Sequence, residues 1–564
     1  MRNVLMIQGR QTAGLTALAA AALLAGCFSD GADSTGVAPL AIQALNSQAR
    51  YQVVLKDAIT GERITDSLSV TFTGAADLKA ADGSSLNGKT ITTTDGLVAL
   101  GATFSATAKE FSVLVGNRTL GWVETGTRVV ADTKATGDQI VELKLVNVNK
   151  ATAVNASSAP VAMTVTSASA GADGKLAAPV ALATASKTVT NAEGASETIG
   201  SSTLGLSTGT TGKAADGTVA AAGPLTVSAT HYANADVSSM SAFPGGFAAT
   251  VSGAPSSVLN GASANDGAFV TGGFAQFNVT DSNGKAIKTF DKPVAVSIDL
   301  PKSSLDANGN ALVPGVSKYP IWSFNDSTGE WQFEKEGLVV EKTPVDANNY
   351  TVKFETNHLS SWNLDFYGAS CTAQINLTGR PAGDARPLEV NIVGTTGQRF
   401  SRSVYPNDSQ VTLYRVPSYT RMQVKVLDRG QLVGQTTTPV ALCSGAVRIP
   451  VTLQPIPMGT VLVETSESCA DGTSKRPLPT FAWVYDAGRT WRNGYTKAAS
   501  STATVASWSQ ASLVTGSSTV YAYNPRSNRY DTRTVNVSAN ATATAAFNFT
   551  MDCPRATGAS GSGS

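Results

Sequence analysis

The sequence predicts an all-β protein made of serial antiparallel β-sandwich domains on an N-terminal tether. Apolar and polar residues alternate in segment after segment, which is the period of a strand with one buried face. The 52 glycines, together with Asp and Asn, separate these segments as turn residues. Beyond the first 26 residues, no long stretch carries the apolar period of a helix. At about 150 residues per domain, the 564-residue length favours about four domains, and the segments described below give four or five.

The amino-acid composition excludes several classes of protein and of binding site. Hydrophobic residues make up 42% of the chain, which excludes a wholly disordered protein. The 42 basic and 41 acidic residues give a net charge of +1, so no electrostatic footprint for nucleic acid is present. With only 2 histidines and no C-x-x-C-H segment, the sequence offers no His-rich metal site and no haem attachment. We expect neither a metal nor a cofactor.

The N-terminus has the plan of a signal peptide over residues 1–26. Arg2 and Arg10 precede the apolar run Ala13–Ala25, which is too short for a membrane-spanning helix of about 20 residues. The run closes with Leu24-Ala25-Gly26-Cys27, which resembles the lipobox of bacterial lipoproteins. The resemblance implies cleavage before Cys27, a diacylglycerol thioether on its sulfur and acylation, such as palmitate, of its amino group. The alternative is a plain secretory signal with an incidental cysteine.

The residues after Cys27 predict location. Lipoproteins retained at the inner membrane usually carry Asp next to the lipidated cysteine, whereas Phe28 stands here. The resemblance therefore implies a lipid-anchored protein of the outer membrane, periplasmic or surface-exposed. Residues 27–48 read as a flexible tether, and no apolar run of spanning length follows Cys27.

Four cysteines remain, Cys371, Cys443, Cys469 and Cys553. In an exported protein, four cysteines indicate two disulfides, for which three connectivities exist. Sequential pairing is favoured because each loop then has the size of one sandwich domain, and each bridge would stabilise its domain by about 4 kcal/mol. Zinc bound by the four cysteines is the alternative, but no C-x-x-C knuckle supports it.

Alternating segments divide the mature chain. The first β-sandwich spans residues 49–149, and its opening strand and Asp57–Gly61 turn weakly resemble carboxypeptidase-regulatory-like and CnaB-like modules. Residues 150–223 are rich in Ala, Thr, Ser and Gly, and read as a linker or as a thin β segment that uses a neighbour's core. The remaining predicted segments are a β domain at 224–369, disulfide-bonded sandwiches at 370–455 and 456–555, and a disordered tail at 556–564.

Two features of the 224–369 segment resemble metal- or ligand-binding sites. His231 falls on the apolar face of an alternating strand, which favours a core or edge histidine over a ligand. Asp306–Asn310 imitates the opening of a calcium loop, but Ser317 stands where a bidentate Glu is needed. We expect a turn there.

The segment from Tyr319 to Phe366 differs from the rest. It contains Trp322, then Gly329-Glu-Trp331, and later His358-Leu359-Ser360. This pattern resembles the distal half of the GAIN-type autoproteolysis-inducing domain of adhesion receptors. Similar segments occur in bacterial surface lipoproteins and in cartilage intermediate layer protein. The resemblance covers roughly residues 225–369.

The resemblance implies one candidate reaction. His358 would act as general base on the Ser360 hydroxyl, which would attack the Leu359 carbonyl and yield an ester that water hydrolyses. The receptor cysteines are absent, since no Cys lies between residues 28 and 370, and two further domains follow Ser360. The alternative is structural: Trp322, Trp331 and Trp362 form an aromatic core around an unreactive His358-Leu359-Ser360 turn.

Three classes of function remain. The favoured one is a non-enzymatic, membrane-anchored lipoprotein of the cell envelope with a structural, adhesive or scaffolding role. A self-cleaving surface protein and a glycan- or protein-binding module are the alternatives. An ordinary hydrolase is disfavoured because no G-x-S-x-G elbow is present. The candidate binding aromatics lie in the last domain: Trp483, Tyr485, Trp491, Tyr521 and Tyr523.

Overall fold

The computed structural model describes residues 49–553 except 108–109, 131–136, 151–160, 191–195, 235–236, 241, 327, 383, 385, 395–399, 405, 407, 489–490 and 528. Cys27 with its lipobox, the tether at 27–48 and the tail at 556–564 lie outside the described residues. The all-β prediction is confirmed, because strands and short helical turns are the elements of the described chain. No helix in that part of the chain is both long and apolar enough to cross a membrane.

The N-terminal domain is a sandwich of two sheets, ordered β3-β5-β1-β8 and β4-β2-β6-β7. Alternate side chains of both sheets meet in one apolar core, in which Tyr51, Phe72 and Trp122 are buried. The first strand, β1, pairs in parallel with the last strand, β8. The bounds are Ala49–Asp57 (β1), Leu68–Gly74 (β2), Asp77–Ala80 (β3), Thr90–Thr93 (β4), Leu97–Thr103 (β5), Glu110–Asn117 (β6), Arg118–Leu120 (η1), Trp122–Val130 (β7), Gly137–Leu145 (β8) and Val148–Lys150 (η2).

The central domain begins earlier than residue 224. Strands β9, β10, β13 and β14 belong to one 14-stranded sheet with the later strands, so much of the described part of 150–223 is sheet and not linker. Its small side chains alternate and share the core of β18 and its neighbours, as the thin-β interpretation requires. The bounds are Val161–Ala170 (β9), Val180–Ala183 (β10), Lys187–Thr190 (β11), Ser196–Ile199 (β12), Ser202–Leu206 (β13), Gly212–Ala214 (β14) and Gly223–Tyr232 (β15).

The second half of the central domain carries its longest strands. β17 lies between β15 and β22, and β19 pairs with β22 on the other side. The bounds are Val237–Met240 (α2), Val251–Ser252 (β16), Ser256–Leu259 (α3), Gly267–Thr280 (β17), Ala286–Pro301 (β18), Lys318–Asn325 (β19), Glu330–Glu341 (β20), Asn349–His358 (β21) and Ser361–Thr378 (β22).

The third domain shares β22 with the central domain. The first part of β22 pairs with β17, and its last part pairs with β25 and β28. The boundary predicted at residue 370 therefore lies inside one continuous strand. The second sheet of this domain has the order β24-β23-β26-β27. The bounds are Glu389–Gly394 (β23), Ser401–Val404 (β24), Gln410–Pro417 (β25), Met422–Asp428 (β26), Gln431–Gln435 (β27), Leu442–Ser444 (η3) and Val447–Pro450 (β28).

The C-terminal domain is again a two-sheet sandwich. One sheet joins β30, β29, β34 and β33, with β37 pairing in parallel to β29, and the other has the order β32-β31-β35-β36. The bounds are Met458–Cys469 (β29), Arg476–Pro477 (β30), Phe481–Tyr485 (β31), Trp491–Tyr495 (β32), Lys497–Ala498 (β33), Ala506–Val514 (β34), Gly516–Asn524 (β35), Arg529–Val537 (β36) and Thr542–Met551 (β37).

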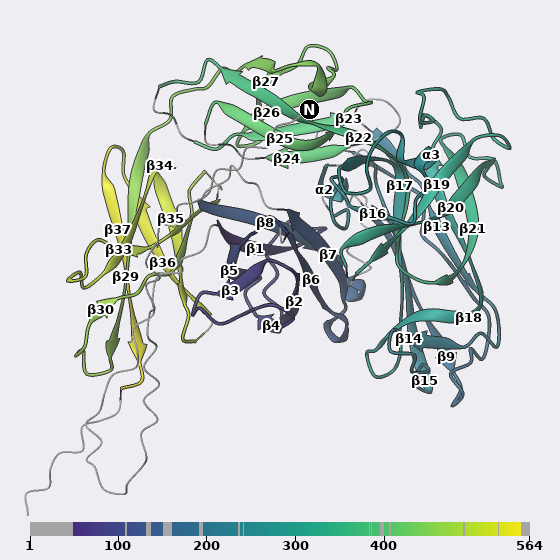
Figure 1. Ribbon diagram of the computed structural model, residues 1–564, viewed down its shortest axis with the longest axis horizontal. Helices are drawn as coiled ribbons and strands as arrows, with labels where there is room; N and C mark the ends of the chain where they lie inside the picture. The colour runs from purple at the N-terminus through teal and green to yellow at the C-terminus, as the bar shows by residue number, and fades with distance from the viewer. Residues whose placement is uncertain are drawn as a thin grey trace, which may run out of the picture.

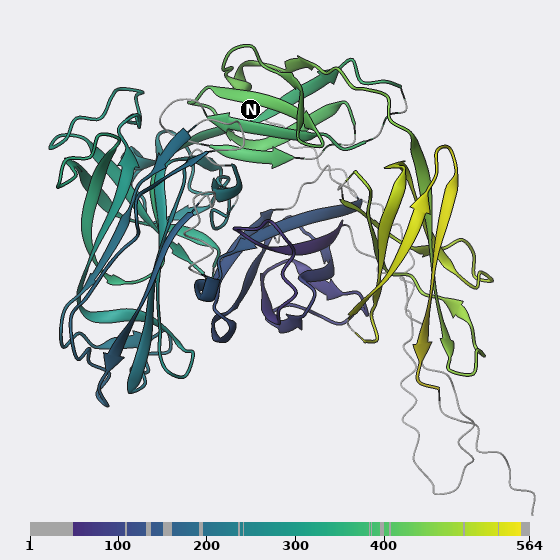
Figure 2. The ribbon, with the colours of Figure 1, turned by 180° about the vertical axis from the view of Figure 1, so that it is seen from behind.

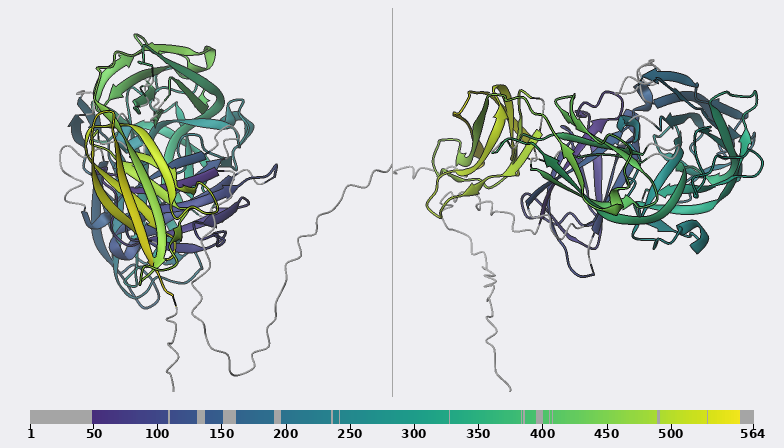
Figure 3. Two further views of the ribbon diagram at one scale, coloured as in Figure 1. Left: turned by 90° about the vertical axis from the view of Figure 1, so that its left-hand side faces the viewer. Right: turned by 90° about the horizontal axis from the view of Figure 1, so that it is seen from above.

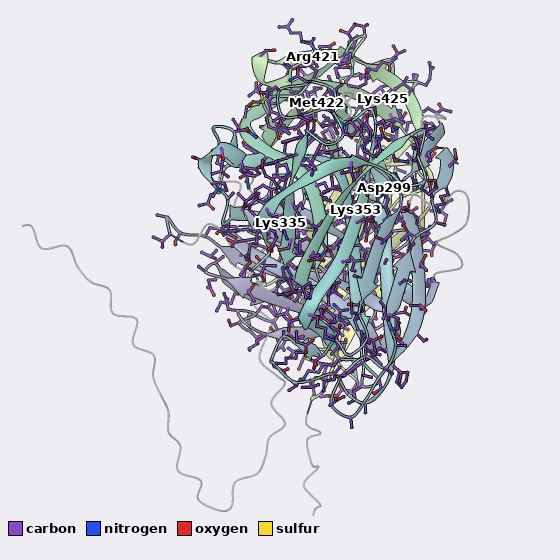
Figure 4. The ribbon with its side chains drawn as sticks, turned by 90° about the vertical axis from the view of Figure 1, so that its right-hand side faces the viewer. Asp299, Lys335, Lys353, Arg421, Met422 and Lys425 are labelled. Atoms are coloured by element: carbon purple, nitrogen blue, oxygen red, sulfur yellow. A yellow bond between two sulfur atoms is a disulfide. The ribbon has the colours of Figure 1, made fainter. Side chains whose placement is uncertain are left out.

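The four domains do not form a straight row. The N-terminal domain lies between the central and C-terminal domains, and the third domain bridges them above it (Figures 1 and 2). Seen from above, the C-terminal and central domains lie at opposite ends, with the third and N-terminal domains between them (Figure 3, right). In Figure 4 the third domain lies above the central domain. The labelled side chains on these two domains are Asp299, Lys335, Lys353, Arg421, Met422 and Lys425. The sequence predicted the order of the domains, but not their return onto the first one.

Candidate functional site

The turn predicted for self-cleavage joins two strands of the central sheet. β21 ends at His358 and β22 begins at Ser361, so Leu359 and Ser360 form the connection. Both are buried, and their backbone is tied down: the Leu359 N–H donates to Lys288 O at 2.9 Å, and Ser360 O accepts from Phe277 N–H at 3.2 Å. Neither residue has the positive φ of a strained left-handed backbone.

The side chains of this turn point to different partners. His358 Nε2 lies 3.1 Å from Glu334 Oε1, and the His358 ring is 5.0 Å from the ring of Trp362. The Ser360 hydroxyl instead donates to the backbone carbonyl of Phe324. Burial acts to raise the pKa of Glu334, but hydrogen bonds from His358 and Ser323 outweigh it and lower that pKa. The geometry thus commits both residues to structural contacts and does not place His358 as a base on Ser360.

The tryptophans of the same segment form the aromatic core of the structural interpretation. Trp322, Trp331 and Trp362 are each 0% exposed. The indole N–H of Trp322 donates to Asp365 O at 2.9 Å, and that of Trp331 donates to Pro244 O at 3.0 Å. These bonds satisfy buried polar groups and fix the rings.

His231 is the buried strand histidine that the alternation predicted. It lies on β15, and its Nδ1 is 2.6 Å from Ser202 Oγ. Its surroundings, which include Asp299 and Asn349, leave a cavity with room for about one water molecule. The Asp306 loop is a turn, as predicted, because its carboxylate accepts the backbone N–H groups of Asn308 and Asn310. The described residues contain no cluster of His, Cys, Asp or Glu that could hold a metal.

The aromatic face of the C-terminal domain is covered by the N-terminal domain. Trp483 is fully buried and packs with Val54 and Leu97 of the first sandwich. The guanidinium of Arg63 lies 5.7 Å from the ring of Trp491 and 4.9 Å from the ring of Tyr521. We call this interface between the N-terminal and C-terminal domains the clasp.

The other half of the clasp lies over β31, β32 and β36. Ala81 and Ala99 of the first domain share an apolar cluster with aromatic residues of the last. Arg50 lies 4.9 Å above the ring of Tyr495, and Gln52 Nε2 donates to Tyr530 Oη at 2.9 Å. Of the five candidate binding aromatics, Trp483 and Tyr523 are therefore buried, and the rings of Trp491 and Tyr521 face Arg63 of the first domain. The aromatic residues of the apolar cluster are Phe481, Tyr495 and Tyr523, with Tyr530 packed against it.

The N-terminal domain also contacts the central domain. Arg128 pairs with Glu110 of its own domain and, at 2.8 Å, with Glu330 of β20. Gly245 N–H donates to Gly126 O at 2.9 Å, and Gln276 Nε2 donates to Glu124 O at 3.2 Å. The first domain is held on two sides.

The cysteines pair sequentially. Cys371 bonds to Cys443, and Cys469 bonds to Cys553, which is the connectivity that loop size favoured. Cys371 lies within β22 and Cys443 in η3, whereas Cys469 ends β29 and Cys553 follows β37. Each bridge therefore ties the first strand of a domain to the end of the same domain.

The residues of the clasp were missed as functional residues by sequence reasoning. Gln52 and Tyr530 are 478 residues apart, and no pattern in either segment signals the other. The one available signal is the row of aromatics on β31, β32 and β35, which by sequence alone is compatible with a domain core or with a surface for a partner.

Comparisons with known proteins place the chain in no family. No protein-family model matches it, and no curated protein is similar to it. A solved minor pilin of Streptococcus agalactiae, GBS52, has 11% identity, covers 33% of this chain and 98% of its own, and has a TM-score of 0.16. BcpA, the major pilin subunit of Bacillus cereus, has 10% identity, covers 89% and 99%, and scores 0.13. Scores this low do not indicate a shared overall fold or a shared function.

Proposed function

We propose that this protein is a non-enzymatic lipoprotein of the bacterial cell envelope, anchored in the outer membrane through Cys27, with a structural, adhesive or scaffolding role. The observation that carries the proposal is the closed four-domain ring, in which the first domain is held by both the central and the last domain. An anchored N-terminus would then carry one rigid body rather than a flexible string of modules.

Three kinds of contact support that rigidity. β22 runs without a break from the central into the third domain. Disulfides close the third and fourth domains. Interfaces of buried apolar groups, cation–π contacts and ion pairs hold the first domain on both sides. The residues that the sequence offered for chemistry, His358 and Ser360, are used in structural hydrogen bonds.

The anchor is tested by metabolic labelling of the producing cells with a palmitate analogue. We expect label on the full-length protein and none on the Cys27→Ser variant. Protease treatment of intact and of permeabilised cells then distinguishes a surface-exposed from a periplasmic protein. An unlabelled wild-type protein, or one released from the envelope without detergent, would contradict the proposed anchor.

The structural or adhesive role is tested in a deletion strain that expresses either the wild-type chain or the Cys27→Ser variant. Surface attachment and envelope integrity are compared between the two. Under the proposal, the wild-type chain restores the lost property and Cys27→Ser does not, although it folds. A deletion strain that matches the parent in both properties would contradict the structural and adhesive role.

A further inference from the structure

Three polar side chains lie together inside the central domain, between β17 and β22. Thr271, Asn363 and Asp365 are each 0% exposed. Thr271 is the cross-strand partner of Asp365. Asn363 stands two residues before Asp365 on the same strand and therefore on the same face of the sheet. A register shift between Thr271 and Gly273 accompanies this grouping. One hydroxyl, one carboxamide and one carboxyl group thus share a site closed to solvent.

The hydrogen bonds of this trio are incomplete. Thr271 Oγ1 donates to Asn363 Oδ1 at 3.2 Å and accepts the Gly273 N–H at 3.1 Å. Asn363 Nδ2 and both carboxyl oxygens of Asp365 form no hydrogen bond of good geometry with a described residue, although Thr271 and Asn363 are close enough to lower the pKa of Asp365. Each such buried group costs about 1–3 kcal/mol, and natural cores rarely keep several together without a chemical reason.

The protonation of Asp365 suits proton transfer. Burial raises the pKa of Asp365 well above its ordinary value, and the neighbouring Thr271 and Asn363 side chains offset this only in part. The raised pKa favours the protonated carboxyl group, which has one O–H to donate and one oxygen to accept.

We propose that Thr271 and Asn363 join in an intramolecular ester cross-link between β17 and β22. Thr271 Oγ1 attacks the side-chain carbonyl carbon of Asn363, while one Asp365 oxygen takes the hydroxyl proton. The protonated Asp365 oxygen gives its proton to the departing nitrogen, so the C–N bond breaks and ammonia leaves. The carboxylic acid is regenerated and no oxidant or cofactor is consumed. The closed, dry site supplies the positioning that an isolated threonine and asparagine lack.

The place of this link fits the architecture. The third and fourth domains have a disulfide each, whereas no cysteine lies between residues 28 and 370. β22 leaves the central domain to become the first strand of the third, so a bond from β17 to β22 would fix the strand that connects them.

Mass spectrometry of the full-length protein tests the link. After reduction and trypsin digestion, we expect residues 214–285 and 354–399 as one joined species, because trypsin does not cleave before Pro381 or Pro387. Its mass should be about 17 Da below the sum of the two peptides because ammonia is lost. Alkaline hydroxylamine, which cleaves esters, should separate them. Separate peptides at their sequence masses would overturn the proposal. So would a joined species about 18 Da lighter, since loss of water makes Asp365 the acceptor.

Variants assign the roles. Thr271→Ala and Asn363→Ala should each yield the two separate peptides, and Thr271→Ser, which keeps the hydroxyl, should retain the link. Asp365→Asn should leave most of the chain unlinked. Thr230→Ala is the matched control, because Thr230 is also buried on a neighbouring strand with an unpartnered hydroxyl. A loss of ammonia that persists in Thr271→Ala would reflect cyclisation at Asn363 alone and would overturn the ester.

Discussion

His231 shows at the residue scale how burial turns one side chain into a source of pH-dependent stability. Burial lowers the pKa of His231 to about 4, and Asp299 opposes this only in part, while Lys342 adds to it. The unfolded chain binds a proton at an ordinary pKa near 6.5, so between these two values the unfolded state holds more protons than the folded one. Stability is therefore lost as the pH falls through this window, and no further loss from this group follows below it.

We expect the free energy of unfolding of the central domain to fall by on the order of 3 kcal/mol between neutral pH and the folded pKa of His231. Chemical unfolding at a series of pH values measures it. The His231→Gln variant should lack this part of the pH dependence while keeping the rest. Parallel pH profiles of the two proteins would contradict the assignment.

At the scale of elements, the turn between β21 and β22 shows most clearly what the structure adds to the sequence. The sequence placed His358, Leu359 and Ser360 in a tripeptide that resembles a cleavage motif, and it offered an aromatic core as the alternative. The choice between these two interpretations depends on where the side chains of His358 and Ser360 point, which a pattern of residue types does not show. In the structure, His358 hydrogen-bonds with Glu334, and the Ser360 hydroxyl donates to the Phe324 carbonyl.

From this geometry we expect purified wild-type protein to run as one full-length band after denaturation and reduction. Ser360→Ala should run at the same position and lose about 1 kcal/mol of stability, the usual cost of one hydrogen bond. Two fragments from the wild-type protein that vanish in Ser360→Ala would establish self-cleavage and contradict this expectation.

The pairing of first and last strands is a second property of elements. β29 and β37 pair in parallel over the full length of β37, and the Cys469–Cys553 bond lies at the end of this pair. The sequence predicted antiparallel sandwiches, and the spacing of the cysteines predicted their sequential pairing. The parallel pairing of first and last strands in the N-terminal, third and C-terminal domains could not be predicted, because alternation identifies a strand but not the strand it pairs with.

Replacing Cys469 and Cys553 by Ser should lower the stability of the C-terminal domain by about 4 kcal/mol in the chain-entropy account. Hydrogen exchange resolved along the chain measures it. Protection should fall across β29–β37, while the Cys371→Ser and Cys443→Ser pair serves as the control that affects the third domain. Unchanged exchange in the C-terminal domain would show that the bridge contributes nothing there.

At the scale of the whole molecule, the clasp decides whether the domains form a ring or a string. Its apolar clusters and its two cation–π arginines favour closure. Three buried polar atoms at the same interface, Gln52 Oε1, Arg63 Nη1 and Trp483 Nε1, have no hydrogen-bond partner among the described residues. Opening would hydrate these atoms, so they lower the stability of the closed form. Long-range closure of this kind depends on surfaces more than 380 residues apart, which is why the sequence predicted the domains and not the ring.

The ring should therefore open when its arginines are removed. Each cation–π contact contributes about 0.5–2 kcal/mol, so Arg50→Ala with Arg63→Ala should shift the chain toward an extended form with a larger radius of gyration in X-ray scattering. Opening should also make Trp491 and Tyr521 accessible to oxidative footprinting. Arg533→Ala is the matched control, since Arg533 lies 5.5 Å from the ring of Phe547 within the C-terminal domain. If the double variant scatters like the wild-type protein and its aromatics stay protected, apolar packing alone holds the clasp and the arginines are dispensable. If Arg533→Ala opens the ring as well, the cause is the stability of the last domain and not the interface.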